Sequence, residues 1–270
     1  MVIGNTKRIY LRQFSIQNVN TIHIRDEHPT TIGSDEISQL TRKHRNLFSE
    51  LNEKLTYTTK VVAEIRTISD TPIYSKSYPY PTSLKQEVED QVNKLLEDGI
   101  IRKSRSPYNS HVWIVPKKND ASGEKKFRMV IDYRKLNTVT IADKYPIPEI
   151  NEVLSQLGET RIFSVIDLKS GFHQIPLKES DVEKTAFSVN NGKYEFTRLP
   201  FGLKNAPSIF QRTLDDILRQ YIGKICYVYI DDLIIFSKDE KSHSEHIDKI
   251  FDTLRKANMK VQADKCEFYK

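Results

Sequence analysis

An acidic pair between two apolar runs constrains the fold of this chain more than any other feature of its sequence. The runs are Ile225–Ile230 and Leu233–Phe236, and Asp231 and Asp232 separate them. Short apolar runs joined by two turn-forming residues are typical of a β-hairpin, and strands without a polar face are buried on both sides. We therefore predict a buried hairpin with the two acids at its turn, covered by other elements of the chain.

Those covering elements are predicted from residue 81 onward. Apolar spacing indicates strands at 112–115, 127–131, 162–166, 187–189 and 194–196. Helices are expected to begin with Ser83, Asn205 and Ser242 as capping residues, and Gly99 is expected to end the first of them. Asn191-Gly192 predicts the turn of a further hairpin. Because hairpins are mixed with helices, the predicted fold class is α+β rather than a doubly wound parallel sheet.

The first eighty residues are less regular. Residues 9–24 have strand-like apolar spacing, and a short helical pattern follows at residues 37–48. Three prolines and three tyrosines lie between residues 72 and 81. They predict an extended strap, because proline does not fit inside a helix. A domain boundary is expected near residue 80.

The positive charge of the chain is concentrated in one block. The net charge is +6, and residues 102–135 hold ten Lys or Arg and three Asp or Glu, which is +7 and leaves −1 elsewhere. Such a block suits a polyanion such as nucleic acid or a nucleoside triphosphate, with a solvated basic face as the alternative. No apolar run approaches the ~20 residues of a membrane span. Two cysteines make no disulfide framework, which favours a reducing, intracellular compartment.

Asp167 follows the predicted strand 162–166 and adds a third acid. Two carboxylates about 4 Å apart repel by roughly 4 kcal/mol at an effective dielectric of 20, so such a cluster stays charged only beside cations. Three acids without a His or Cys cluster suit Mg²⁺ or Mn²⁺, and two such ions can clamp both oxygens of a phosphoryl transfer. The residues alone leave open a plain hairpin turn at Asp231-Asp232 and a strand-end cap at Asp167.

Other chemical motifs are absent from the sequence. It contains no Walker A or G-x-G-x-x-G segment, no cysteine pair with zinc spacing and no G-x-S-x-G nucleophile elbow. His243 and His246 lie one helical turn apart, but no further ligand accompanies them. We expect both to be surface residues of a helix.

Four segments, in order along the chain, resemble the reverse transcriptases of retroviruses and, more closely, of gypsy-type LTR retrotransposons. They are Phe127–Asn137, Phe163–Phe172, Leu199–Pro207 and Tyr229–Asp232. The resemblance implies a right-hand polymerase fold, with fingers at 81–142 and 175–205 and a palm with an antiparallel sheet at 143–174 and 206–270. Residues 1–80 are then an upstream linker or protease tail followed by the strap, and the thumb is absent.

The resemblance also implies the site residues. Asp167, Asp231 and Asp232 match catalytic ligands of two Mg²⁺ ions, which Mn²⁺ can replace, and Leu168 matches a further ligand through its carbonyl. The expected dNTP-binding residues are Lys117, Lys118, Arg128, Phe172 and Phe201, with Phe172 as the ring that excludes a ribose 2′-hydroxyl. The expected template and primer contacts are Trp113, Arg134, Asn137 and Tyr229. For Phe172 and Trp113, a place in the core is the alternative.

Two positions depart from the pattern of the family. Phe201 stands where retroviral enzymes usually have Gln and gypsy-type relatives commonly have Phe, which narrows the resemblance to the latter. His111 stands where the family usually has Pro.

The implied function is RNA-directed DNA polymerisation within a Pol polyprotein. Its expected partners are an RNA or DNA template, a primer strand and a dNTP, with protease, thumb and RNase H domains in cis and no membrane. The expected location is a cytoplasmic particle or the nucleus. Two alternatives stand beside it: a truncated or co-opted fragment that binds nucleic acid without polymerising, and a two-metal nuclease.

Overall fold

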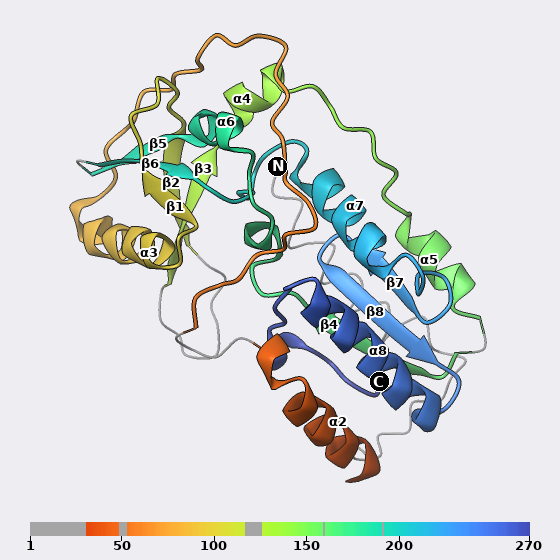
Figure 1. The fold of residues 1–270 in the computed structure, drawn as a ribbon. Helices are drawn as coiled ribbons and strands as arrows, with labels where there is room; N and C mark the ends of the chain where they lie inside the picture. Colours follow the sequence, from red (N-terminus) through yellow and green to blue (C-terminus); the bar gives the residue numbers. More distant parts are fainter. Residues whose placement is uncertain (1–30, 49–52, 117–125, 159, 191) are drawn as a thin grey trace.

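A computed structural model describes residues 31–48, 53–116, 126–158, 160–190 and 192–270. Helices and antiparallel sheets form two groups that lie side by side (Figure 1), which confirms the predicted α+β class. Short 3₁₀ turns lie at Arg45–Leu47, Thr82–Leu84, Gly171–Gln174, Glu183–Thr185 and Ala263–Lys265. In these ranges, no helix is both long and apolar enough to cross a membrane.

The first group is built on an antiparallel sheet with the strand order β4–β8–β7. Its elements are β4 (Ile162–Asp167), β7 (Cys226–Tyr229), β8 (Asp232–Ser237), α5 (Ile150–Gln156), α7 (Ala206–Leu218) and α8 (Glu240–Lys256). Every residue of the central strand β8 is buried, as its apolar run predicted. Helices α7 and α8 contact each other and pack on the sheet (Figure 1), because each presents an apolar stripe of helical period.

The second group contains two smaller sheets, a β2–β3 hairpin and a sheet of order β1–β6–β5. Its elements are β1 (Ile101–Lys103), β2 (His111–Pro116), β3 (Phe127–Asp132), β5 (Phe187–Val189), β6 (Gly192–Phe196), α3 (Lys85–Glu97), α4 (Arg134–Val139) and α6 (Glu179–Val182). β2 contacts β5, so the two sheets pack together. Apolar spacing did not indicate β1, because only Ile101 of that strand is buried.

The hairpin between β5 and β6 turns one residue earlier than predicted. Val189 pairs with Gly192, and Asn190 has a left-handed φ of 48°. Moving the turn by one residue changes the partner of each residue by two positions, so packing of the strands decides the register rather than the turn residues. Gly99, with φ 64°, ends α3 as predicted.

The predicted helix caps are only partly correct. The N-cap of α3 is Leu84, without a side-chain hydrogen bond, because Ser83 belongs to the 3₁₀ turn that leads into the helix. Helix α8 begins earlier than expected, and its N-cap is Asp239, whose carboxylate accepts from the Ser242 backbone N–H at 2.9 Å. Asn205 is the N-cap of α7 as predicted, but its side chain makes no capping hydrogen bond.

Residues 31–48 and 53–80 pack against the rest of the described chain. Helix α2 (Thr31–Lys43) lies along α8 (Figure 1), where Lys43 and His44 each contact Asp248 at 2.7 Å. This confirms a helix in the region where the pattern at 37–48 predicted one. The extended chain of residues 53–80 follows, and isolated backbone bridges join Ala63 to Leu177, Thr67 to Thr140 and Tyr74 to Asn109. The strand-like segment at 9–24 lies outside the described residues.

His243 is buried, so the expectation of a surface residue is wrong. Its exposed fraction is 0%, and its ring nitrogens bond the hydroxyls of Ser164 on β4 and Ser237 on β8, each at 2.8 Å. His246 is half-buried and reaches the same Ser237 hydroxyl at 2.7 Å. The side chain of His243 points inward because it lies one helical turn from Ile247, on the face of α8 that covers the sheet.

Candidate active site

Two of the three predicted acids lie side by side. Asp167 is the last residue of β4, Asp232 is the first of β8, and the antiparallel register pairs them directly. They are 4% and 7% exposed. Side chains paired in this way have Cβ atoms about 4.5–5.5 Å apart, and like charges at such a pair repel. A buried pair of this kind remains charged most easily when a cation lies beside it.

Asp231 lies next to this pair, on the turn. Buried Tyr229 pairs with Asp232, so Ile230 and Asp231 form the two-residue turn between β7 and β8. The turn predicted at Asp231-Asp232 is therefore wrong by one residue, and the shift places Asp232 in the strand, opposite Asp167. Ile230 has φ 52°, a left-handed conformation that costs a β-branched residue about 1–3 kcal/mol.

The acids provide oxygen ligands for a metal ion, but they do not complete its coordination shell by themselves. Among the residues that the structure describes, no three His, Cys, Asp or Glu side chains form a group that holds a metal ion by itself. Mg²⁺ is commonly held by one or two carboxylates together with substrate phosphates, so the Asp167–Asp232 pair fits this ion. Leu168, the predicted carbonyl ligand, is buried and lies in a backbone bridge with Val261.

Three phenylalanines pack together, one after β4, one in the loop before α7 and one on α7 itself. The ring of Phe172 lies 4.9 Å from that of Phe201 and 5.2 Å from that of Phe210. Phe172 is 7% exposed and Phe201 is 49% exposed. A Cβ atom on Gly171 would lie 2.7 Å from the Phe210 ring, so a residue without a side chain is needed there. Phe172 is therefore held firmly, while Phe201 presents its ring to solvent.

The β2–β3 hairpin carries other predicted binding residues. Trp113 is 51% exposed, so it does not lie in the core, and its ring stands edge-on to that of His111 at 4.7 Å. Arg128 on β3 is half-buried, and within the described ranges its Nε atom has no hydrogen-bond partner. Lys117 and Lys118 lie outside the described residues. The hairpin thus carries an aromatic ring and a cation. It belongs to the second group, whereas the acids belong to the first.

Arg134 and Asn137 already have partners in the protein. Arg134 forms a bidentate ion pair with Asp132, with N–O distances of 2.9 and 2.6 Å, and this pair lowers the pKa of Asp132 to about 2. The amide of Asn137 donates to the Gly202 carbonyl at 2.9 Å and accepts from the Lys204 backbone N–H at 2.8 Å. Asn137 therefore fastens α4 to the loop before α7, which links the second group to the sheet that carries the acids.

One residue near the acids was not predicted from the sequence. Gln211 on α7 is 1% exposed, and its side-chain oxygen accepts from the Ile230 backbone N–H at 2.8 Å. The sequence does contain a signal, because Leu214 and Leu218 lie three and seven residues further on and belong to the core. Position 211 is thus on the buried face of the helix, where a polar side chain needs partners.

Comparisons with known families and proteins confirm the resemblance to reverse transcriptases. The model of a family described as reverse transcriptase (RNA-dependent DNA polymerase) matches residues 115–270. The chain is 55% identical over 252 residues to the retrovirus-related Pol polyprotein from transposon opus of Drosophila melanogaster, and 51% identical over 261 residues to that from transposon gypsy of the same species. The matches cover 93% and 96% of this chain but 25% of each relative. The chain thus spans about a quarter of the length of these curated relatives.

The fold also has a solved counterpart. The structure of the foamy viral protease–reverse transcriptase in complex with an RNA/DNA hybrid matches with a TM-score of 0.79. The match covers 96% of this chain and 33% of that chain, at 24% sequence identity. At this identity the likeness establishes the fold alone, and it confirms the predicted polymerase fold.

Proposed function

The chain belongs to the reverse transcriptase (RNA-dependent DNA polymerase) family, and we propose that it is the polymerase part of a gypsy-type retrotransposon Pol polyprotein. In this proposal it adds deoxynucleotides to the 3′-hydroxyl of a primer on an RNA or DNA template. One observation carries the proposal: Asp167 and Asp232 are buried and paired in register at the ends of two strands. The names of the Drosophila relatives, both Pol polyproteins, support it.

We assign the metal ligands to the acidic end of the β4–β8–β7 sheet. Asp167 and Asp232, with Asp231 and the carbonyl of Leu168, would hold two Mg²⁺ ions, for which Mn²⁺ can substitute. When bound, such ions activate the primer hydroxyl and neutralise the charge that develops on the triphosphate. The contribution of the chain is to fix the carboxylates, because Asp167 and Asp232 lie on strands that pair with each other.

The nucleotide site follows from the neighbouring residues. Arg128, with Lys117 or Lys118, would neutralise the triphosphate. Phe172 and Phe201 would border the deoxyribose, and the close packing of Phe172 supports this role, because a ring that cannot move rejects an added hydroxyl by steric clash.

The proposed template and primer contacts lie on both groups of elements. The exposed ring of Trp113 is suited to stack on a template base. Arg134, Asn137 and Tyr229 would complete these contacts. Arg134 would then share its charge between a phosphate and Asp132.

The proposed partners are the template, the primer and a dNTP, with the protease, thumb and RNase H domains of the polyprotein in cis. Two observations support this set. The relatives are polyproteins of which this chain matches 25%, and the foamy viral protein with the same fold was captured with an RNA/DNA hybrid.

The acidic pair provides the test. Asp167→Asn and Asp232→Asn each remove one charge and keep the shape of the side chain. We expect Mg²⁺-dependent primer extension to fall at least about a hundredfold in each variant, because a metal ligand is lost. The unfolding temperature should stay the same or rise, because the repulsion between the paired carboxylates is relieved. Primer extension and thermal unfolding are measured on the same preparations.

Asp216→Asn is the matched control, since Asp216 is an exposed carboxylate on α7 that pairs with Arg219 at the surface. It should retain full activity. Unchanged extension in both variants of the acidic pair would overturn the proposal. Salt-sensitive binding of an RNA–DNA hybrid without extension by the unaltered chain would favour the binding fragment. Shortening of the primer would favour the nuclease.

A further inference from the structure

The turn between β7 and β8 has an unfavourable backbone for its sequence. Of its two residues, Ile230 has a positive φ of 52°, and Asp231 does not have a positive φ. A positive φ at the first central residue alone is the pattern of a type II′ turn, in which glycine is preferred at that position. Isoleucine does not adopt this conformation without support, so contacts from outside the hairpin have to maintain it.

Gln211 makes these contacts from α7. Its side-chain oxygen accepts from the Ile230 backbone N–H at 2.8 Å, and its amide nitrogen donates to the Val228 carbonyl at 3.1 Å. One side chain therefore bonds the strand before the turn and the first residue of the turn. Because Gln211 is 1% exposed, water does not replace these bonds easily.

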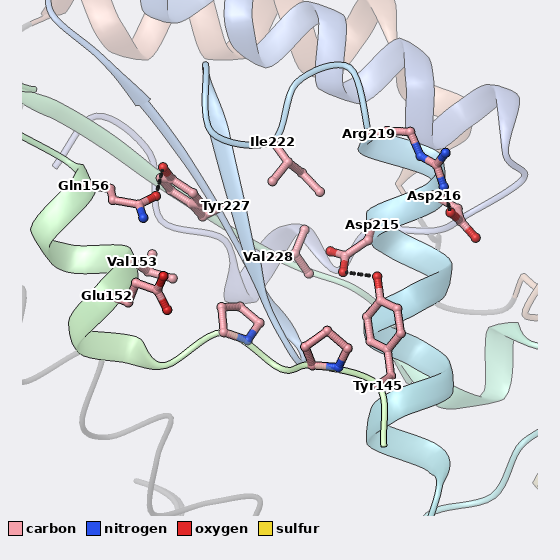
Figure 2. Close-up of a pocket in the computed structure, with 12 residues that line it drawn as sticks. Tyr145, Glu152, Val153, Gln156, Asp215, Asp216, Arg219, Ile222, Tyr227 and Val228 are labelled. Atoms are coloured by element: carbon pink, nitrogen blue, oxygen red, sulfur yellow. Dashed lines mark hydrogen bonds and ion pairs between the residues drawn. The ribbon is translucent and has the colours of Figure 1, made fainter. Parts of the chain in front are cut away.

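A second layer sets the orientation of the Gln211 amide. Its nitrogen also donates to Asp215 Oδ1 at 3.0 Å, and the other carboxylate oxygen of Asp215 accepts from the Tyr145 hydroxyl at 2.8 Å (Figure 2). An ionised carboxylate only accepts hydrogen bonds, so the Gln211 nitrogen has to face Asp215 and its oxygen has to face Ile230.

Tyr145 is well suited to hold Asp215 in place. Burial, together with the hydrogen bond to Asp215, raises the pKa of Tyr145 to about 12, so its hydroxyl remains a donor at ordinary pH. The guanidinium of Arg212 lies 4.7 Å from the centre of the Tyr145 ring. Tyr145 and Asp215 line a cavity of about 540 Å³ beside β7, and they form its wall toward α7 (Figure 2).

We propose that Gln211 is a positioning residue, which holds the turn of Ile230 and Asp231 in its strained shape and thereby keeps Asp232 opposite Asp167. The inference rests on the proposed polymerase function. Gln211 touches neither substrate nor metal in this proposal and acts through the backbone of the turn. A misplacement of reacting groups by about 1 Å can cost a hundredfold in rate, so the shape of this turn matters for the acids beside it.

The test compares two polar-to-apolar substitutions on the same helix. Gln211→Leu removes the hydrogen bonds to the turn. Thr213→Val is the matched control, because Thr213 is also buried and its hydroxyl bonds only the Ile209 carbonyl of its own helix. We expect Gln211→Leu to lower kcat about tenfold or more with the KM for dNTP within about twofold, and Thr213→Val to change neither. Both are measured well below their unfolding temperatures.

Hydrogen exchange gives a readout that does not depend on activity. The Ile230 amide should exchange at least about tenfold faster in Gln211→Leu than in the unaltered chain, and should not change in Thr213→Val. Together, activity and hydrogen exchange distinguish a failure of the proposed polymerase function from a failure of the positioning role of Gln211. If the unaltered chain does not polymerise, the proposed function fails even when exchange responds as expected. If it polymerises and neither kcat nor exchange changes in Gln211→Leu, the positioning role is overturned.

A double-mutant cycle with Ile230→Gly tests the mechanism itself. Glycine adopts a positive φ without strain, so the turn should keep its shape without Gln211. We expect the loss of kcat caused by Gln211→Leu to shrink to less than about threefold in the Ile230→Gly background. A loss of the same size in both backgrounds would show that Gln211 does not act through the strained turn, and would overturn the inference.

Discussion

Phe172 lies in the core and is also proposed to exclude a ribose 2′-hydroxyl, two roles that the sequence presents as alternatives. Its ring is buried between Phe201 and Phe210, with ring centres 4.9 and 5.2 Å away, so it belongs to the core. The same packing fixes the ring in the segment that follows Asp167, where the proposed nucleotide site lies. A ring that sorts sugars by clash has to be immobile, and core packing supplies that immobility.

Replacement of Phe172 tests the proposed sorting of sugars. Phe172→Val shortens the side chain, so a ribose 2′-hydroxyl should find space. We expect the efficiency of ribonucleotide incorporation relative to deoxyribonucleotide incorporation to rise by about 10- to 100-fold, the range of pocket-based discrimination between similar substrates. The measurement is kcat/KM for a matched pair of dNTP and rNTP. Phe251→Leu, at a buried position of α8 outside this cluster, should reduce stability without changing that ratio. An unchanged ratio in Phe172→Val would leave Phe172 with its packing role alone.

At the scale of the elements, α8 is joined to the sheet by a buried polar contact as well as by apolar packing. His243 on the helix bonds hydroxyls of both β4 and β8. Burial lowers the pKa of His243 to about 4, and the charge of the neighbouring His246 acts in the same direction. The imidazole is therefore neutral at ordinary pH, and the contact depends on its staying neutral.

The stability of this interface should depend on pH. The unfolded chain protonates His243 below about pH 6.5, whereas the folded chain resists until about pH 4. Its contribution is therefore complete above pH 6.5 and is lost as the pH falls toward 4, by about 2 kcal/mol at pH 5. Urea unfolding at pH 7 and pH 5 measures this loss. In His243→Gln the loss should be smaller by about that amount, while His173, also with a pKa lowered to about 4, contributes equally to both proteins. Equal losses would contradict the prediction.

At the scale of the whole molecule, residues 31–48 and 53–60 are part of the folded body. Leu47 is 0% exposed, and its carbonyl accepts from the Val261 N–H at 2.9 Å. The ammonium group of buried Lys260 bonds the Asn46 carbonyl and a Glu53 carboxylate oxygen, each at 2.7 Å. These contacts join Asn46, Leu47 and Glu53 to the chain that follows α8.

Leu47→Ala should therefore destabilise the whole chain. A fully buried leucine leaves a cavity when it is shortened, which typically costs 2–5 kcal/mol, so we expect a loss of about that size in the free energy of unfolding. Asn46→Ala, next in the chain but with an exposed side chain, should change it by less than about 0.5 kcal/mol. Urea denaturation followed by circular dichroism measures both. If Leu47→Ala is as stable as Asn46→Ala, the segment does not belong to the cooperative core.

The sequence by itself determined those features of the fold and the site that depend on patterns of residues close together in the chain. Apolar periodicity predicted the α+β class and the main strands and helices, and four motifs predicted the family and named Asp167, Asp231 and Asp232. Lys117 and Lys118 lie outside the described residues, so their role stays a prediction. Only the tertiary structure decided the register that sets Asp232 opposite Asp167, the burial of His243 and the contact of Gln211 with Ile230. Moving a hairpin turn by one residue changes little in local propensity but changes which residues pair across the strands, so contacts between residues far apart in the chain decide it.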